Sequence, residues 1–148
     1  MSFFKVLYSP DGKKLTSLRD AMQAGVGLEY LPGEIVRATV GPILAYSTLD
    51  AAMAFVEQST SELKTNLQIW IAEGELDQRY LGIERLIKPE HLSPTTVRNF
   101  WTKIEAFGDA TQANPALDAY LQDKRKGLFL REPRAKSLEW IRLKARVL

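Results

Sequence analysis

The hydrophobic pattern changes its period between residues 30 and 75, and this stretch predicts the centre of the fold. Two short apolar segments, 35–40 and 43–46, are separated by Gly41 and Pro42. Short apolar segments divided by such residues are typical of neighbouring strands joined by a turn. A helical pattern follows, and the nearly continuous apolar run 69–71 then predicts a strand covered on both faces. Together they predict a strand, hairpin, helix and strand unit.

Further elements are expected on both sides of this unit. Aromatic and β-branched residues before a Ser-Pro-Asp-Gly turn predict a first strand, and apolar spacings of three and four residues predict a short helix after it. Two prolines in helix-start positions predict two consecutive helices later in the chain. These elements are strands at 3–8 and 83–87, a helix at 15–24, and helices that begin at Pro94 and Pro115.

The last eleven residues, 138–148, fit two structures. Alternate apolar residues, Ile141, Leu143, Ala145 and Val147, match a strand, whereas Leu138, Ile141, Ala145 and Leu148 match one face of a helix. We favour the strand.

The overall prediction is a single α+β domain that spans residues 1–148. A chain of 148 residues with 45% hydrophobic content is long enough for one compact core. We expect a mixed or antiparallel sheet of about five strands, with three to four helices packed on it.

Composition excludes several classes of site and location. The chain contains no Cys and a single His, His91, which argues against disulfides, thiolate chemistry and a zinc site. We therefore expect no metal and no cofactor. The N-terminus lacks the pattern of a secretory leader, and no apolar run approaches the ~18 residues that cross a bilayer. A soluble, cytoplasmic protein without a membrane partner is expected.

Charge is distributed unevenly along the chain. Residues 122–148 hold nine Lys/Arg and three acidic residues, a net charge of +6 within a chain whose total is only +2. If this segment ends in a strand, its alternate residues share one face, with cations about 6.6 Å apart. These residues are Trp140, Arg142, Lys144 and Arg146.

Such a face predicts two different roles. A nucleic-acid strand could place its phosphates on the cations and stack a base on Trp140. Alternatively, the charges form an edge that blocks aggregation while Trp140 packs into the body.

A third possibility comes from Ser47-Thr48, at a strand end, and Glu73-Gly74-Glu75, at the end of a later strand. In order and type these residues resemble part of the arginine, serine-threonine-serine and glutamate-x-glutamate pattern of ADP-ribosyltransferases. The resemblance implies that Arg37 and Ser47 help to hold NAD and that Glu75 is the catalytic acid. The third residue of the triplet is Leu49, and Arg37 lies only ten residues before Ser47. The alternative is that Ser47 and Thr48 cap a helix and the glutamates solvate a strand end.

The sequence favours a small, non-catalytic module that acts through protein contacts or self-association. No nucleophile motif, metal cluster or phosphate loop stands out. Aromatic residues at helical spacing usually lie in the core, but the neighbours Phe100 and Trp101 cannot share one narrow helical stripe, so one of the pair is expected to reach a partner surface. The predicted contact residues are Trp101, Trp140, Arg142, Lys144 and Arg146. Nucleic-acid binding and the NAD-using enzyme are the alternatives.

Overall fold

A computed structural model of the chain describes residues 2–18, 22, 27–38, 40–80, 85–86, 94–107, 115–122, 129–130 and 135–148. The strands are β1 (Ser2–Tyr8), β2 (Leu15–Thr16), β3 (Glu29–Tyr30), β4 (Ile35–Arg37), β5 (Ile43–Tyr46), β6 (Leu67–Leu76), β7 (Arg85–Leu86), β8 (Phe129–Leu130) and β9 (Ala135–Arg146). The helices are α2 (Leu49–Gln58), α3 (Ser61–Lys64), α4 (Pro94–Ala106) and α5 (Pro115–Gln122), with one 3₁₀ turn at Gln78–Tyr80.

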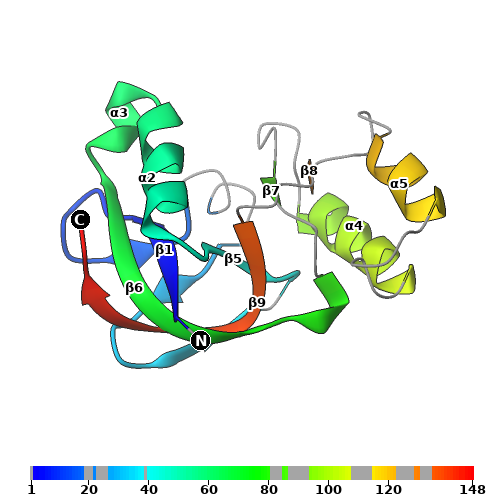
Figure 1. Cartoon of the computed structure of the whole chain (residues 1–148), viewed down its shortest axis with the longest axis horizontal. Helices are drawn as coiled ribbons and strands as arrows, with labels where there is room; N and C mark the ends of the chain where they lie inside the picture. The colour runs from blue at the N-terminus through cyan, green and yellow to red at the C-terminus, as the bar shows by residue number, and fades with distance from the viewer. Residues whose placement is uncertain are drawn as a thin grey trace.

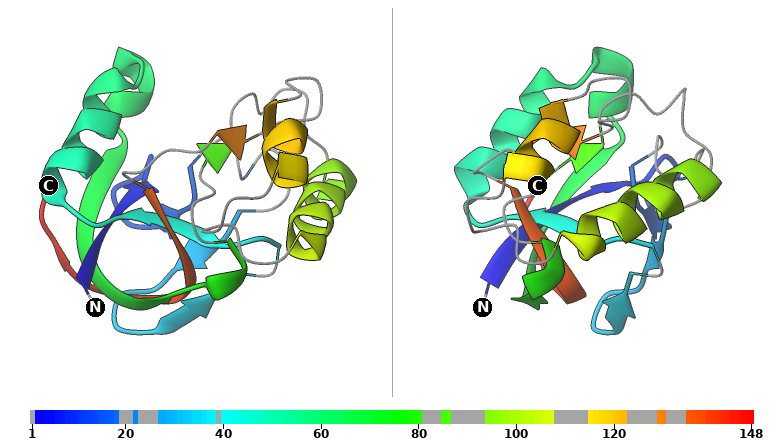
Figure 2. Two further views of the ribbon diagram at one scale, coloured as in Figure 1. Left: turned by 45° about the vertical axis from the view of Figure 1, so that its right-hand side comes forward. Right: turned by 90° about the vertical axis from the view of Figure 1, so that its right-hand side faces the viewer.

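Four antiparallel strands, β1, β5, β9 and β6, close into a small barrel. β1 pairs with β6 along its whole length and with β5 through Phe4 and Tyr46, and β9 pairs with both β5 and β6. Figure 2 shows this ring of strands. β2 and β3 extend the sheet beyond β1, and β4 extends it beside β9. Closure leaves these four strands with few free edges.

Alternate side chains along the strands fill two separate cores. Inward residues of the barrel form the first, together with Leu15 of β2 and Tyr30 of β3. Outward residues of β1, β5, β6 and β9 form the second, against α2. Phe3, Leu7, Ile43, Ala45, Ala72, Leu138, Ile141 and Leu143 belong to the inner core, and Val6, Tyr46, Leu67, Ile69 and Ala135 to the outer one.

Helix α2 forms where the sequence predicts it. Thr48 is the N-cap, and its side chain accepts a hydrogen bond from the backbone N–H of Ala51. Ala51, Ala52, Phe55 and Val56 form the buried face on the outside of the barrel. The side-chain period of 3.6 residues thus turns this helix onto the sheet.

Helices α4 and α5 lie beside the barrel, at the right of Figure 1, whereas α2 and α3 lie above it. The Trp101 ring of α4 meets the Tyr80 ring edge-on, with 4.7 Å between ring centroids. Phe100, Ile104 and Leu117 are buried in the same layer. The aromatic residues of α4 therefore hold this helix against the end of β6.

The expected fold class is wrong. The described chain forms a closed four-stranded barrel with additional strands and four short helices, rather than a sheet of about five strands with helices packed on it. The helices divide between two sides of the barrel (Figure 1). Period-two patterns identify strands but do not show which strands pair, and here β9 pairs along both of its edges.

Local predictions had mixed outcomes. The strand at the C-terminus is confirmed, since β9 runs from Ala135 to Arg146. The helix expected at 15–24 is wrong at its start, because Leu15 and Thr16 form β2 and pair with β3. Residues 19–21, 23 and 24 of that prediction lie outside the described residues. The strand expected at 83–87 is described only at 85–86, where it forms β7.

Lys5 is the one charged residue in the row of inward side chains on β1. It lies between Phe3 and Leu7, and its Nζ donates a 2.6 Å hydrogen bond to the carbonyl oxygen of Leu44. The ammonium also lies 5.6 Å from the centroid of the Tyr30 ring. Desolvation by burial lowers the pKa of Lys5 from 10.5 to about 8.

This burial predicts a pH-dependent stability. Because the folded-state pKa is below the unfolded one, the protonated amine opposes folding below pH 8, and the penalty fades as the pH rises toward 10.5. At ~1.4 kcal/mol per pKa unit the full penalty is about 3 kcal/mol. Between pH 7 and pH 10 the free energy of unfolding of the parent should rise by roughly 2 kcal/mol relative to Lys5→Met.

Urea unfolding at several pH values measures this difference. Lys13→Met, in an exposed turn, is the matched control and should keep the pH dependence of the parent. Equal pH profiles for Lys5→Met and the parent would contradict the prediction.

Gly41 permits the close approach of α4 to the turn between β4 and β5. Its φ is +69°, and an added Cβ would lie 2.2 Å from Nε1 of Trp101. Gly41→Ala should therefore lower the free energy of unfolding by about 2–3 kcal/mol, through backbone strain and overlap with a rigid buried ring. Gly12→Ala is the control, since φ there is +74° but an added Cβ meets no heavy atom within 4 Å. It should cost only about 1 kcal/mol, and equal losses measured in urea would show that Trp101 is not the obstacle.

Candidate functional site

The candidate site is the outward face of three adjacent strands, β4, β9 and β6. Two rows of residues cross it, because Ile35 pairs with Arg142 and Arg142 with Glu73, while Arg37 pairs with Trp140 and Trp140 with Glu75. Lys144 lies beside these rows. We call this surface the outer strand face, and it consists of Ile35, Arg37, Glu73, Glu75, Trp140, Arg142 and Lys144.

This face continues the surface on which α2 packs. Outward residues of β1 and of the first part of β6 lie under α2, as Val6 and Ile69 show. Farther along this surface, Ile35 is 51% exposed. The exposed Ile35 and the half-buried Trp140 give this part of the sheet apolar area among its charged side chains.

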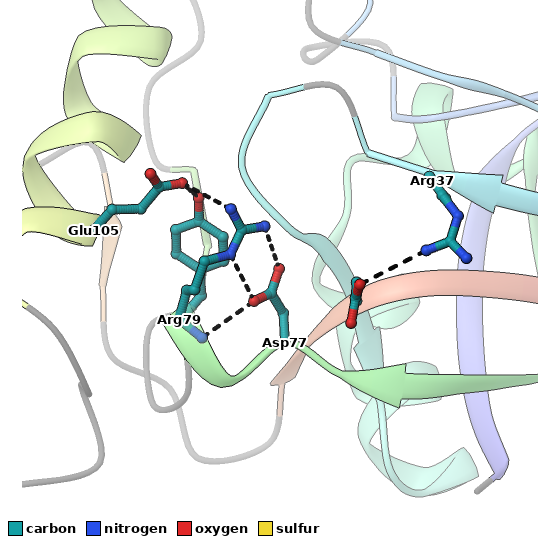
Figure 3. Close-up of polar contacts among 6 residues, drawn as sticks. Arg37, Asp77, Arg79 and Glu105 are labelled. Carbon is teal, nitrogen blue, oxygen red and sulfur yellow. Dashed lines mark hydrogen bonds and ion pairs between the residues drawn. The ribbon is translucent and has the colours of Figure 1, made fainter.

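Each cation of the outer strand face lies beside a carboxylate. Arg142 hydrogen-bonds to Glu73 and forms an ion pair with it, and Nζ of Lys144 lies 3.8 Å from Oε1 of the same residue. Nη1 of Arg37 lies 3.7 Å from Oε1 of Glu139, the contact drawn at the right of Figure 3. With Glu75, the face and its border hold three cations and three carboxylates. The unpaired basic strip expected from the sequence is therefore locally neutral.

Trp140 is held in place by a side-chain contact. Its Nε1 donates a 3.2 Å hydrogen bond to Oε2 of Glu75, its neighbour on β6. Gly74 lies between the two glutamates, and an added Cβ there would lie 2.5 Å from the backbone oxygen of Trp140. The glycine thus allows β6 and β9 to approach closely at the centre of the face.

Arg146 does not continue the face, contrary to expectation. The register between β6 and β9 shifts between Ile71 and Ala72, so that Ile71 pairs with Ala145 while Ala72 pairs with Leu143. Lys144 is the extra residue of this bulge, and Arg146 pairs with Trp70, whose side chain packs against the inner core. A bulge reverses the alternation of side chains, which strict i, i+2 spacing does not anticipate.

Trp101 occupies the core and not the surface expected for it. Its side chain is only 4% exposed and packs against Tyr80 and Phe100. Next to it, Tyr80 donates a hydrogen bond to Glu105. The expectation failed because Phe100 and Trp101 both find buried positions between α4, α5 and the end of β6.

A second polar cluster joins the barrel to α4 (Figure 3). Arg79 donates through Nε and Nη2 to the two carboxylate oxygens of Asp77, at 3.1 and 2.9 Å, and its Nη1 lies 3.2 Å from Glu105. Asp77 is buried, and its backbone N–H donates to the carbonyl of Ser137. The bidentate pair between the Arg79 guanidinium and the buried Asp77 carboxylate therefore links β6, β9 and α4.

The residues implied by the ADP-ribosyltransferase resemblance are only partly brought together. Arg37 and Glu75 lie in one row on either side of Trp140, so their Cα atoms are about 10 Å apart, two strand spacings. Ser47 follows Tyr46, which pairs with Ala135, five residues along β9 from Trp140. That separation is about 16 Å of strand. Ser47 thus lies at the N-terminus of α2, away from the other two residues.

Sequence reasoning missed Ile35 and Glu73 as members of the face. Their role follows from pairing across strands, because Ile35 and Glu73 lie on opposite sides of Arg142. The only sequence signal was the alternation Glu73-Gly74-Glu75, which places two carboxylates on one side of a strand.

Comparisons with known proteins do not identify the chain. No family model, curated protein or solved structure matches the chain. Within the described residues, no three His, Cys, Asp or Glu side chains form a group that could hold a metal ion. No helix in the described ranges is long and apolar enough to span a bilayer.

Proposed function

We propose that the chain is a non-catalytic, cytoplasmic module that binds a protein through the outer strand face. The observation that supports this proposal is the pairing of Arg37, Arg142 and Lys144 with nearby carboxylates. A polyanion would have to displace those carboxylates or accept their repulsion. Ile35 and Trp140 offer apolar area that a protein partner could bury.

The partner we propose is an extended protein segment that adds to the edge of β4 with which no described strand pairs. Strand addition draws its affinity from main-chain hydrogen bonds and its specificity from side chains on one face. On this face the segment would meet Ile35 and Arg37 directly, with Trp140 in the next strand. A segment with an apolar side chain and charges of both signs matches that surface.

The nucleic-acid alternative makes the opposite prediction about oligonucleotides. The parent should show no salt-sensitive binding to short single- or double-stranded oligonucleotides, because the three cations of the outer strand face already lie beside carboxylates. A Glu73→Gln/Glu75→Gln variant should gain weak, salt-sensitive binding. Fluorescence anisotropy at two salt concentrations measures both.

One result would replace the proposal by the nucleic-acid alternative. In that result, the parent binds oligonucleotides, the binding weakens steeply with salt, and an Arg142→Ala/Lys144→Ala/Arg146→Ala variant no longer binds them.

Protein binding is tested with a photo-crosslinking amino acid at position 35 in an extract of the source cells. The crosslinked protein is identified by mass spectrometry, purified and titrated against the parent. Ile35→Lys should weaken its binding at least about tenfold, since a charge replaces the central apolar contact. Met53→Lys, at an exposed apolar position on α2, is the matched control and should bind as the parent does.

The proposal fails if no protein is crosslinked, or if the identified protein binds Ile35→Lys as tightly as the parent. Circular dichroism of each variant ensures that a loss of binding is not a loss of fold.

A further inference from the structure

Strand β4 has one paired edge and one open edge among the strands that the structure describes. It pairs with β9 and stands at one end of the strand order. Its first residue, Ile35, is 51% exposed, and Leu31, four residues before it, is 53% exposed. An open edge with exposed apolar neighbours is a template for strand pairing with another chain.

We propose that the segment which adds to this edge is β4 of a second copy of the chain, an inference that rests on the proposed function. Two copies would pair antiparallel about a two-fold axis beside Val36. In that register Val36 faces its own counterpart, and Ile35 of each copy faces Arg37 of the other. The sheet then runs without interruption from β6 and β9 of one copy through both β4 strands to β9 and β6 of the other.

The charges of the outer strand face support a self-complementary contact. Pairing of the two β4 edges places the two outer strand faces side by side in one sheet, so faces of one charge sign would repel each other. This face and its border instead contain three cations and three carboxylates, and Arg37 already lies beside Glu139. In the dimer the apolar stem of Arg37 covers the exposed Ile35 of the second copy, because directly opposed Cβ atoms lie about 5 Å apart.

The length of β4 sets the strength of this contact. Three residues, Ile35–Arg37, supply few main-chain hydrogen bonds. We therefore expect the contact to bury less than the ~1,200 Å² at the lower end of stable interfaces. The dimer is therefore reversible and depends on protein concentration.

Sedimentation velocity over a wide concentration range tests the inference. The parent should shift from monomer toward dimer as the concentration rises. Ile35→Lys should remain monomeric, because the introduced lysine faces Arg37 of the second copy at both ends of the strand pair. Met53→Lys is the control and should dimerise as the parent does.

A charge exchange tests the register itself. In the double variant Ile35→Lys/Arg37→Glu, each introduced lysine faces an introduced glutamate of the other copy, so dimerisation should return. Rescue is expected only for an antiparallel pair centred on Val36. Circular dichroism confirms that each variant is folded.

Three outcomes would overturn the inference. They are a parent that stays monomeric at every concentration, a dimer that persists in Ile35→Lys, and a double variant that stays monomeric. A monomeric parent whose crosslinked partner still requires Ile35 would remove the second copy while keeping the proposed function. If the parent stays monomeric and no crosslinked partner requires Ile35, both the inferred dimer and the proposed function are ruled out.

Discussion

The fold depends on the pairing of β9 along both of its edges. One edge binds β6, and the other binds β5 through Ala135–Leu138 and then β4 through Trp140–Arg142. Without β9 the barrel has no closure, and the inner core loses Leu138, Ile141 and Leu143. The C-terminal segment is thus the strand that completes the core. Because this core fixes which residues of β9 point inward, it also fixes which of them point outward.

This constraint explains what could be predicted from the sequence. Helix α2 was predictable because its cap, Thr48, and its apolar stripe are local signals, and the strand of residues 138–146 followed from its alternation. Barrel closure was not predictable in this way, because it depends on contacts between residues far apart, such as Tyr46 with Ala135. Leu15 and Thr16 were mistaken for a helix for the same reason, since pairing with β3 overrides their weak local preference.

The charged residues also show that the local sequence gives only part of the information, and that contacts between distant residues give the rest. Counted along the chain, residues 122–148 carry a net charge of +6. Measured across strands, Arg142 and Lys144 share a carboxylate, Glu73, that lies about seventy residues earlier. A charge run therefore predicts a partner only after its neighbours on adjacent strands are known. Trp101 makes the parallel point for aromatic residues, because its helical position gave no hint of the ring of Tyr80.

Two bulges limit the size of the outer strand face. The register of β6 against β9 shifts between Ile71 and Ala72 and again between Glu75 and Leu76. Bulges increase local twist, so only the residues between them form a regular surface. Those residues, Ala72–Glu75, pair with Leu143–Trp140, and β4 pairs with Arg142–Trp140 of the same stretch. The two cross-strand rows therefore mark the extent of the regular sheet, and a contact made there is necessarily small. A small, charge-balanced face with one exposed isoleucine suits a reversible contact better than a permanent one.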